Sequence, residues 1–169
     1  MKNKVAFLGI LTALALIFSY IESVIPFQIG IPGVKLGLAN LIVVIALYML
    51  DAKSACVVSV VRVVLAGLMF GSLFSILYSL AGGLLSFLVM YLLKRTNRFS
   101  ILGVSLAGGV MHNAGQLLIA MVTVESLNLL YYLPILLVAG TITGLLIGVA
   151  AREIMRSLKP ILAGRAHSS

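Results

Sequence analysis

Thiols and carboxylates are almost missing from this chain, which has one cysteine, one aspartate and three glutamates among its 169 residues. The lone thiol of Cys56 forms neither an internal disulfide nor a thiolate metal cluster with this chain alone. We expect no metal site and no cofactor. Charged residues make up 9% of the chain and hydrophobic residues 62%, which excludes an ordinary soluble domain. The composition therefore predicts an integral membrane protein in contact with the lipid bilayer.

Proline, glycine and charged residues divide the chain into six apolar segments, each expected to be a helix. They cover residues 5–25, 38–51, 53–68, 71–93, 100–124 and 130–151. A transmembrane helix needs roughly 20 apolar residues, so the second and third segments are short and are expected to form a tight hairpin or to lie partly inside the protein. We predict one all-α, six-helix transmembrane bundle over residues 1–157 and a short basic, disordered tail over 158–169. Five or four spans are the alternatives.

The basic residues predict the orientation of this bundle, because Lys and Arg accumulate in short cytoplasmic loops. With six spans and a cytoplasmic N-terminus, ten of the twelve basic residues are cytoplasmic, and only Lys35 and Arg62 are not. We therefore predict that both termini are cytoplasmic. The cations are divided among separate loops, so the net charge of +8 indicates topology and no nucleic-acid partner.

Polar and charged side chains interrupt the apolar segments, and their number and positions predict a ligand cavity. Each of them costs roughly a few kcal/mol in hydrocarbon when it lacks a partner, which makes it a candidate for function. On the six-span arrangement they converge on the outer half of the bundle. Beside them lies a serine stripe on the fourth segment, formed by Ser72, Ser75, Ser79, Gly82 and Ser86. We predict an outward-facing, substrate-binding cavity lined by Glu22, Lys35, Asn40, Arg62, Ser79, His112, Asn113 and Gln116.

Structural roles remain open for the same residues. Glu22 and Arg62 would also suit one buried ion pair, and His112 a hydrogen bond to a serine of the fourth segment. Asn40 would also suit a cap on the second helix. The serine stripe would also suit plain helix packing.

The residue types of the predicted cavity favour an anionic, ring-bearing ligand. Arginine, lysine and protonated histidine neutralise a carboxylate or phosphate, whereas amide side chains form directional hydrogen bonds. Tyr20 and Tyr78 are candidates for stacking on a ring. We therefore expect a small anionic solute, such as a vitamin-like molecule or a cofactor precursor.

Two further patterns concern packing and access. Gly140, Gly144 and Gly148 form a repeated GxxxG, which is typical of close helix packing. Residues 26–36, PFQIGIPGVKL, are apolar and broken by proline and glycine. This segment is either a lid over the cavity or a loop that dips into the membrane interface.

Four strings in order carry a resemblance to a known membrane family. They are YIESVIPFQIGIPGVKLGLANL (20–41), SVVRVVLAGLMFGS (59–72), YSLAGGLLS (78–86) and GVSLAGGVMHNAGQ (103–116). They resemble the Gx transporter family, which is also labelled heptaprenyl diphosphate synthase component I. The resemblance covers about residues 5–155 and implies a six-helix fold like the substrate-binding S components of energy-coupling factor (ECF) transporters.

The resemblance also implies partners and a location. In S components a small-residue ridge on the first helix docks the coupling subunit, and the loop after that helix closes the extracellular pocket. Gly9 and Ala13 match the ridge, and residues 26–36 match the loop. The implied protein is a subunit of an importer in the bacterial cytoplasmic membrane, with partner ATPase and transmembrane scaffold subunits.

The synthase label suggests an alternative, a noncatalytic membrane accessory component of heptaprenyl diphosphate or quinone synthesis. Catalysis itself is not expected, because such synthases hold Mg²⁺ through aspartate-rich motifs and Asp51 is the only aspartate. A GxxxxGK[ST] phosphate loop is also missing, so any ATP that drives import would have to be hydrolysed by another subunit. A solitary channel or carrier is the third hypothesis.

Overall fold

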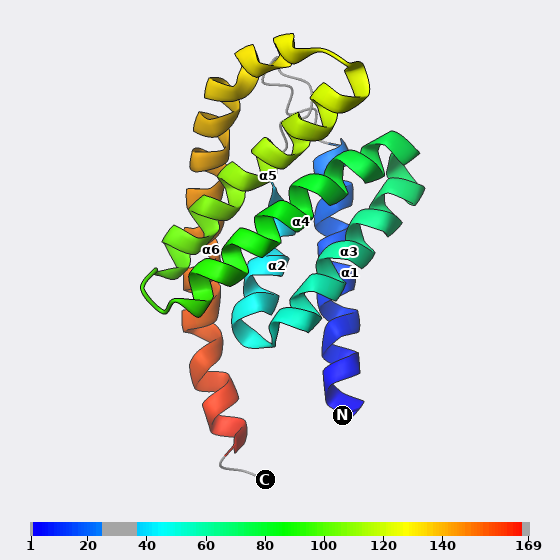
Figure 1. The fold of residues 1–169 in the computed structure, drawn as a ribbon. Coiled ribbons are helices and arrows are strands. Elements are labelled where there is room, and N and C mark those ends of the chain that lie inside the picture. Colours follow the sequence, from blue (N-terminus) through cyan, green and yellow to red (C-terminus); the bar gives the residue numbers. More distant parts are fainter. Residues whose placement is uncertain (1, 25–36, 167–169) are drawn as a thin grey trace.

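Six α-helices and one short 3₁₀ helix make up the part of the chain that the computed structural model describes, residues 2–24 and 37–166 (Figure 1). They are α1 (Lys2–Val24), α2 (Leu38–Met49), α3 (Ala52–Phe70), α4 (Leu73–Arg95), α5 (Ile101–Val124), η1 (Leu127–Tyr132) and α6 (Leu133–Ala166). The helices follow the six expected segments in order. The expected lid, residues 26–36 with Lys35, lies outside the described residues, and the domain boundary at residue 157 stays a prediction.

Five of these helices, α1, α3, α4, α5 and α6, are long and apolar enough to cross a membrane. α2 has 12 residues and is therefore about 18 Å long, less than the ~30 Å hydrocarbon core of a bilayer. The expectation of a short second segment is confirmed. The same expectation for the third segment is wrong, because α3 extends over 19 residues.

The short helix α2 forms the centre of the bundle. Residues 41–47 are all buried, as is Ala39. A helix that is hydrophobic on every side is stable only when other elements surround it. α1, α3 and α6 pack directly against α2, which lies between them in Figure 1. Any polar group carried by α2 therefore lies inside the protein.

Glycines bring α5 into close contact with α6. A Cβ on Gly109 would lie 2.3 Å from the carbonyl oxygen of Gly140, and a Cβ on Gly144 would lie 2.8 Å from Cα of Leu106. Real Cβ atoms do not approach backbone atoms so closely, so both positions require glycine. The interpretation of the GxxxG repeat as a packing surface is confirmed.

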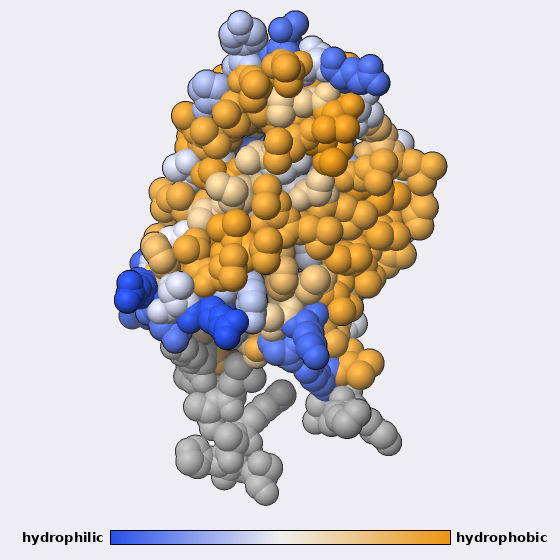
Figure 2. All heavy atoms as spheres, in the orientation of Figure 1, coloured by the Kyte–Doolittle hydropathy of each residue, from blue (hydrophilic) through white to orange (hydrophobic). Residues whose placement is uncertain are grey.

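The outer surface of the bundle is apolar between two more polar ends (Figure 2). α1 begins and α6 ends at the same end of the bundle, which we call the terminal end. The α2–α3 and α4–α5 turns also lie toward this end, and Lys53, Arg95 and Arg98 next to them are exposed. The α3–α4 turn and η1 lie at the opposite end, the far end.

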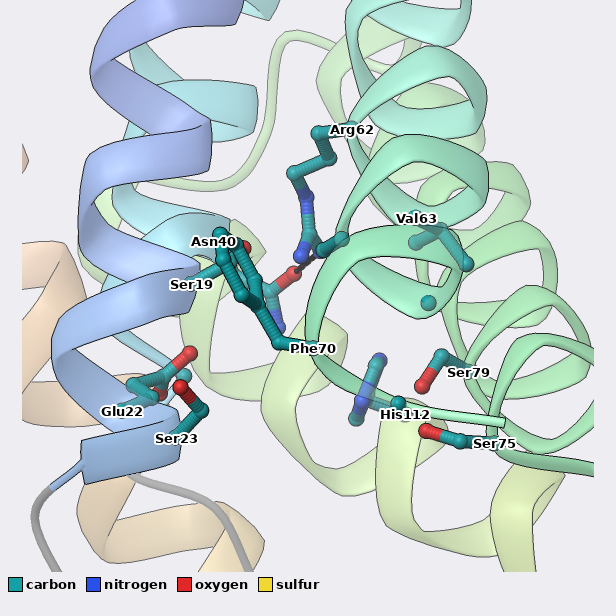
Figure 3. Close-up of a pocket in the computed structure, with 14 residues that line it drawn as sticks. Ser19, Glu22, Ser23, Asn40, Arg62, Val63, Phe70, Ser75, Ser79 and His112 are labelled. Carbon is teal, nitrogen blue, oxygen red and sulfur yellow. Dashed lines mark hydrogen bonds between the residues drawn. The ribbon is translucent and has the colours of Figure 1, made fainter.

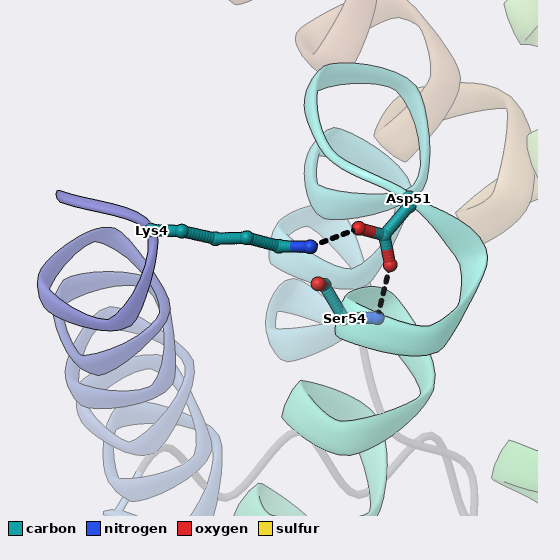
Figure 4. A network of polar contacts seen from close by, with 3 residues as sticks. All are labelled: Lys4, Asp51 and Ser54. Atoms are coloured by element: carbon teal, nitrogen blue, oxygen red, sulfur yellow. Dashed lines mark hydrogen bonds and ion pairs between the residues drawn. The ribbon is translucent and has the colours of Figure 1, made fainter. Parts of the chain in front are cut away.

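A polar network holds α1 against the α2–α3 turn (Figure 4). Asp51 caps α3 by accepting the backbone N–H of Ser54 at 2.8 Å, and its other oxygen accepts a hydrogen bond from Lys4. The Lys4 hydrogen bond, followed by those of Ser54, holds the pKa of Asp51 well below its usual range, at about 2. The carboxylate is therefore ionised at neutral pH and serves this structural contact.

Replacing Gly144 with alanine should lower the unfolding temperature, because its new methyl group meets the backbone of α5. Overpacking of this kind costs about 1–3 kcal/mol. The matched control is Gly9→Ala, where no atom lies within 4 Å of the new Cβ, and its unfolding temperature should not fall. Thermal unfolding of both purified variants in one detergent measures the difference. Equal losses would contradict the assigned helix contact.

Candidate functional site

A polar cavity of about 80 Å³ lies among α1, α2, α3, α4 and α5, where the far ends of α1, α3 and α4 meet. Figure 3 shows side chains from these helices pointing toward one another around it. Phe70, Val63, Ala66 and three glycines supply the apolar part of its wall. The polar residues that line it are Ser19, Glu22, Ser23, Asn40, Arg62, Ser75, Ser79 and His112.

Arg62, in the middle of α3, is the most buried charge of this site, with 7% of its surface exposed. Its Nη2 donates a hydrogen bond to Oδ1 of Asn40 on α2, at 2.5 Å. Its Nε is buried and has no hydrogen-bond acceptor within the described part of the chain. The guanidinium is thus fixed by one neutral partner and retains donors that a ligand can use.

Glu22 supplies the opposite charge from α1. Its Oε1 accepts the backbone N–H of Leu38 at 2.8 Å. Gly37 precedes α2 with φ 73° and provides no side-chain cap, so Glu22 satisfies one of the free N–H groups at this helix end. The carboxylate also acts electrostatically on Arg62. The interpretation of Asn40 as the cap of α2 is wrong, because its side-chain oxygen binds Arg62.

The opposite wall comes from α4 and α5. Ser75, Ser79 and His112 lie together on this side in Figure 3. The two helices approach closely at Gly82, where a Cβ would lie 2.7 Å from the carbonyl oxygen of His112. The serines of α4 have two different roles. Ser75 and Ser79 line the cavity, whereas Ser72 caps the helix by accepting a hydrogen bond from the Ser75 N–H at 3.2 Å.

A second, smaller cavity of about 20 Å³ lies beside the first and shares Gly37, Asn40 and His112 with it. Asn113 lines this second cavity and donates a hydrogen bond to the carbonyl oxygen of Leu136 at 2.8 Å, which links α5 to α6. The volume of this second cavity is enough for about one water molecule. The side chain of Asn113 is thus tied to a helix contact.

The structure brings five of the eight predicted site residues together. Glu22, Asn40, Arg62, Ser79 and His112 line the larger cavity. Asn113 lines only the smaller one, and Gln116 lines neither, because it packs against Gly82 of α4. Lys35 lies outside the described residues. A role in substrate binding stays a prediction for all eight.

Phe70 is a cavity residue that the sequence reasoning missed. It follows Arg62 and Ala66 at steps of four, so helical spacing on α3 would have placed it on the same side. The two tyrosines expected to face a ring do not line the cavity. Tyr20 instead contacts the ring of Phe70, with centroids 5.0 Å apart, and Tyr78 lies beside Phe74.

The lining of the cavity is chemically able to bind a polar molecule. Its lining holds a guanidinium, a carboxylate, an imidazole, an amide and several hydroxyl groups. Among the described residues, no three His, Cys, Asp or Glu side chains are grouped so that they could hold a metal ion. These groups instead offer donors and acceptors to a polar molecule from several directions.

An all-helical bundle with an apolar surface and this polar interior defines a multi-pass membrane protein. The family described as heptaprenyl diphosphate synthase component I matches residues 11–154, and the chain belongs to that family. This match confirms the resemblance seen in the sequence. No curated protein and no solved structure matches the chain.

Replacing Asn40 with leucine should destabilise the protein, because it removes the acceptor of a buried guanidinium N–H. The expected loss is about 1.5–3 kcal/mol, the range for hydrogen bonds to charged groups. Gln116→Leu is the matched control. Gln116 is 3% exposed and its Nε2 has no acceptor within the described residues, so its loss should cost less than about 1 kcal/mol. Thermal unfolding measures both, and an equal loss in Gln116→Leu would contradict these assignments.

Proposed function

We propose that this protein is the substrate-binding, S-component-like subunit of an ECF-type importer in the bacterial cytoplasmic membrane. The observation that carries the proposal is the polar cavity around Arg62. A buried charge in a membrane helix is costly, and such residues commonly mark a substrate path. The protein binds a small solute with an anionic group, of the vitamin-like or cofactor-precursor kind, and releases it toward the cytoplasm.

The cavity of this subunit faces outward, and both termini are cytoplasmic. Two observations support this orientation. Lys53, Arg95 and Arg152 are exposed on segments toward the terminal end, where the positive-inside rule places cytoplasmic charge. The cavity lies where the far ends of three helices meet, toward the opposite end of the bundle.

The ridge of Gly9 and Ala13 on α1 docks the membrane scaffold subunit, which in turn contacts the ATPase. Both residues are exposed, and no atom lies within 4 Å of a Cβ placed on Gly9. The glycines of α6, in contrast, are covered by α5. Small residues let helix backbones approach in lipid, so the uncovered ridge suits a helix of a partner.

The second candidate function is a noncatalytic accessory component of heptaprenyl diphosphate or quinone synthesis. The description of the family favours it. Asp51 is engaged with Lys4 and Ser54 at the helix turn, which speaks against a catalytic role. The cavity of about 80 Å³ has no room for a heptaprenyl chain, so in this role the prenyl chain would have to lie outside it.

Wild-type protein, purified gently, should retain a small ligand that native mass spectrometry detects as a defined added mass. Arg62→Gln should lose at least about nine-tenths of this bound fraction, because the ligand loses its charged partner. Arg152→Gln is the matched control. Its side chain is exposed at the terminal end, and the added mass should persist.

The accessory function predicts a different outcome. Purified protein would then carry no added mass in either form. It would instead stimulate prenyl transfer when it is added to a catalytic synthase with Mg²⁺. That pair of results would contradict the importer proposal.

Cysteine labelling tests the orientation, after Cys56 has been replaced. Asn128→Cys lies in η1 at the far end and should react with a membrane-impermeant maleimide in intact cells. Thr96→Cys lies in the α4–α5 turn and should react only after the membrane is permeabilised. The reverse pattern would place the cavity on the cytoplasmic side.

A further inference from the structure

Two polar atoms in the wall of the larger cavity are buried and have no hydrogen-bond partner within the described residues. They are Oγ of Ser19 on α1 and Nε of Arg62 on α3. In Figure 3 Ser19 lies beside Asn40, and the side chain of Arg62 extends to the same region. Buried polar groups are almost always hydrogen-bonded, because an unmade bond there is costly. These two atoms therefore point to a partner that the described part of the chain does not supply.

The hydroxyl of Ser19 differs from other hydroxyl groups on these helices. Ser23 donates to the carbonyl oxygen of Tyr20 at 2.7 Å, and Thr123 and Thr141 donate to the carbonyl four residues earlier, at 2.7 and 2.8 Å. A bond to the backbone of its own helix is a common way to satisfy a hydroxyl in a membrane. Ser19 makes no such bond. Its hydroxyl can therefore donate to a molecule in the cavity.

Arg62 offers a second donor to the same cavity. Its Nη2 donates to Oδ1 of Asn40, and because the guanidinium is planar and rigid, this bond also fixes the direction of Nε–H. An arginine N–H only donates, so the atom that binds it must be an acceptor. The strongest acceptors for a guanidinium are carboxylate and phosphate oxygens, whose charge-assisted bonds are roughly twice as strong as neutral ones.

The two donors are held on walls that face one small space. Tyr20, next to Ser19, and Phe70, about two turns after Arg62, have ring centroids 5.0 Å apart, which joins α1 to α3. The cavity of about 80 Å³ corresponds to roughly five to eight water molecules at 10–15 Å³ each. A group of a few atoms inside it therefore lies near both walls. Val63 and Phe70 also line it, and hydrogen bonds are stronger in such partly apolar surroundings.

We infer that Ser19 and Arg62 form an oxyanion subsite, in which the Ser19 O–H and the Arg62 Nε–H donate to the oxygens of one carboxylate or phosphate group. The inference rests on the proposed function and specifies where the anionic group of the ligand binds. It also makes Ser19, which the sequence did not single out, a specificity-determining residue.

A nuclear magnetic resonance titration tests the Arg62 donor directly. The protein carries ¹⁵N-labelled arginine in nanodiscs of uncharged lipid, and the Arg62 Nε–H signal is identified by its loss in Arg62→Lys. Acetate or inorganic phosphate should move this proton signal downfield until it saturates, whereas sodium chloride at equal ionic strength and acetamide, the neutral analogue of acetate, should not. The anion that acts at the lower concentration identifies the group as carboxylate or phosphate. A signal that neither anion moves, or that acetamide moves equally, would overturn the inference.

Two serine variants test the second donor. Ser19→Ala should weaken binding of the active anion by about tenfold, the effect of losing one hydrogen bond to a charged group. Its unfolding temperature without ligand should not fall, because the hydroxyl has no partner there. Ser23→Ala is the matched comparison on the same helix and in the same cavity lining, but its hydroxyl is already bonded to Tyr20. Its loss of affinity should be at least about threefold smaller, and equal losses would overturn the inference.

Arg62→Lys separates a directed hydrogen bond from charge alone. Lysine keeps the positive charge but has no Nε–H of fixed direction, so affinity for the anion should also fall by about tenfold. Calorimetry on the folded fraction measures it. Wild-type affinity in Arg62→Lys would overturn the two-donor arrangement.

Native mass spectrometry of Ser19→Ala separates this inference from the proposed function. A retained ligand with the same bound fraction in Ser19→Ala as in wild type would overturn the subsite and leave the importer proposal standing. The absence of any retained ligand from wild type, together with no binding of acetate or phosphate, would overturn both.

Discussion

The hydrogen bond between Arg62 and Asn40 is the contact on which the interior of this protein depends. It joins a buried guanidinium on α3 to the amide of the central helix α2. Without an acceptor, a charge in this position would be too costly to keep in an apolar bundle. The bond ties α3 to α2, and Glu22 ties α1 to the start of α2. Three helices are thereby held around one polar space.

Small residues determine which helix surfaces are used inside the molecule and which remain open. Gly140 and Gly144 are covered by α5, and Gly82 and Gly115 bring α4 against α5. These contacts make α4, α5 and α6 a closely packed unit. Gly9 and Ala13 have the same spacing but remain exposed on α1. The same spacing of small residues is therefore covered on α6, where the backbone of α5 lies against it, and exposed on α1, where no helix of the described chain does.

The family and the cavity bear on function in different ways. Membership connects the chain by name with heptaprenyl diphosphate synthesis. The cavity is small and polar and is lined by both Glu22 and Arg62. Those properties suit a small water-soluble molecule better than a prenyl chain, because an apolar chain gains nothing from two desolvated charges. The contents of the cavity therefore support the proposed binding of a small solute, whereas the family description supports the proposed accessory role.

The sequence by itself determined the helices, because apolar runs and their breaks are local properties that need no knowledge of neighbours. It also identified the costly polar residues, whose types alone predict function or pairing. Only the tertiary structure decided their partners. His112 and Gln116 share one face of α5, yet the close approach of α4 at Gly82 leaves His112 in the cavity and Gln116 outside it. Asn40 likewise binds Arg62 because α2 and α3 meet there, and spacing within one helix does not specify such contacts between helices.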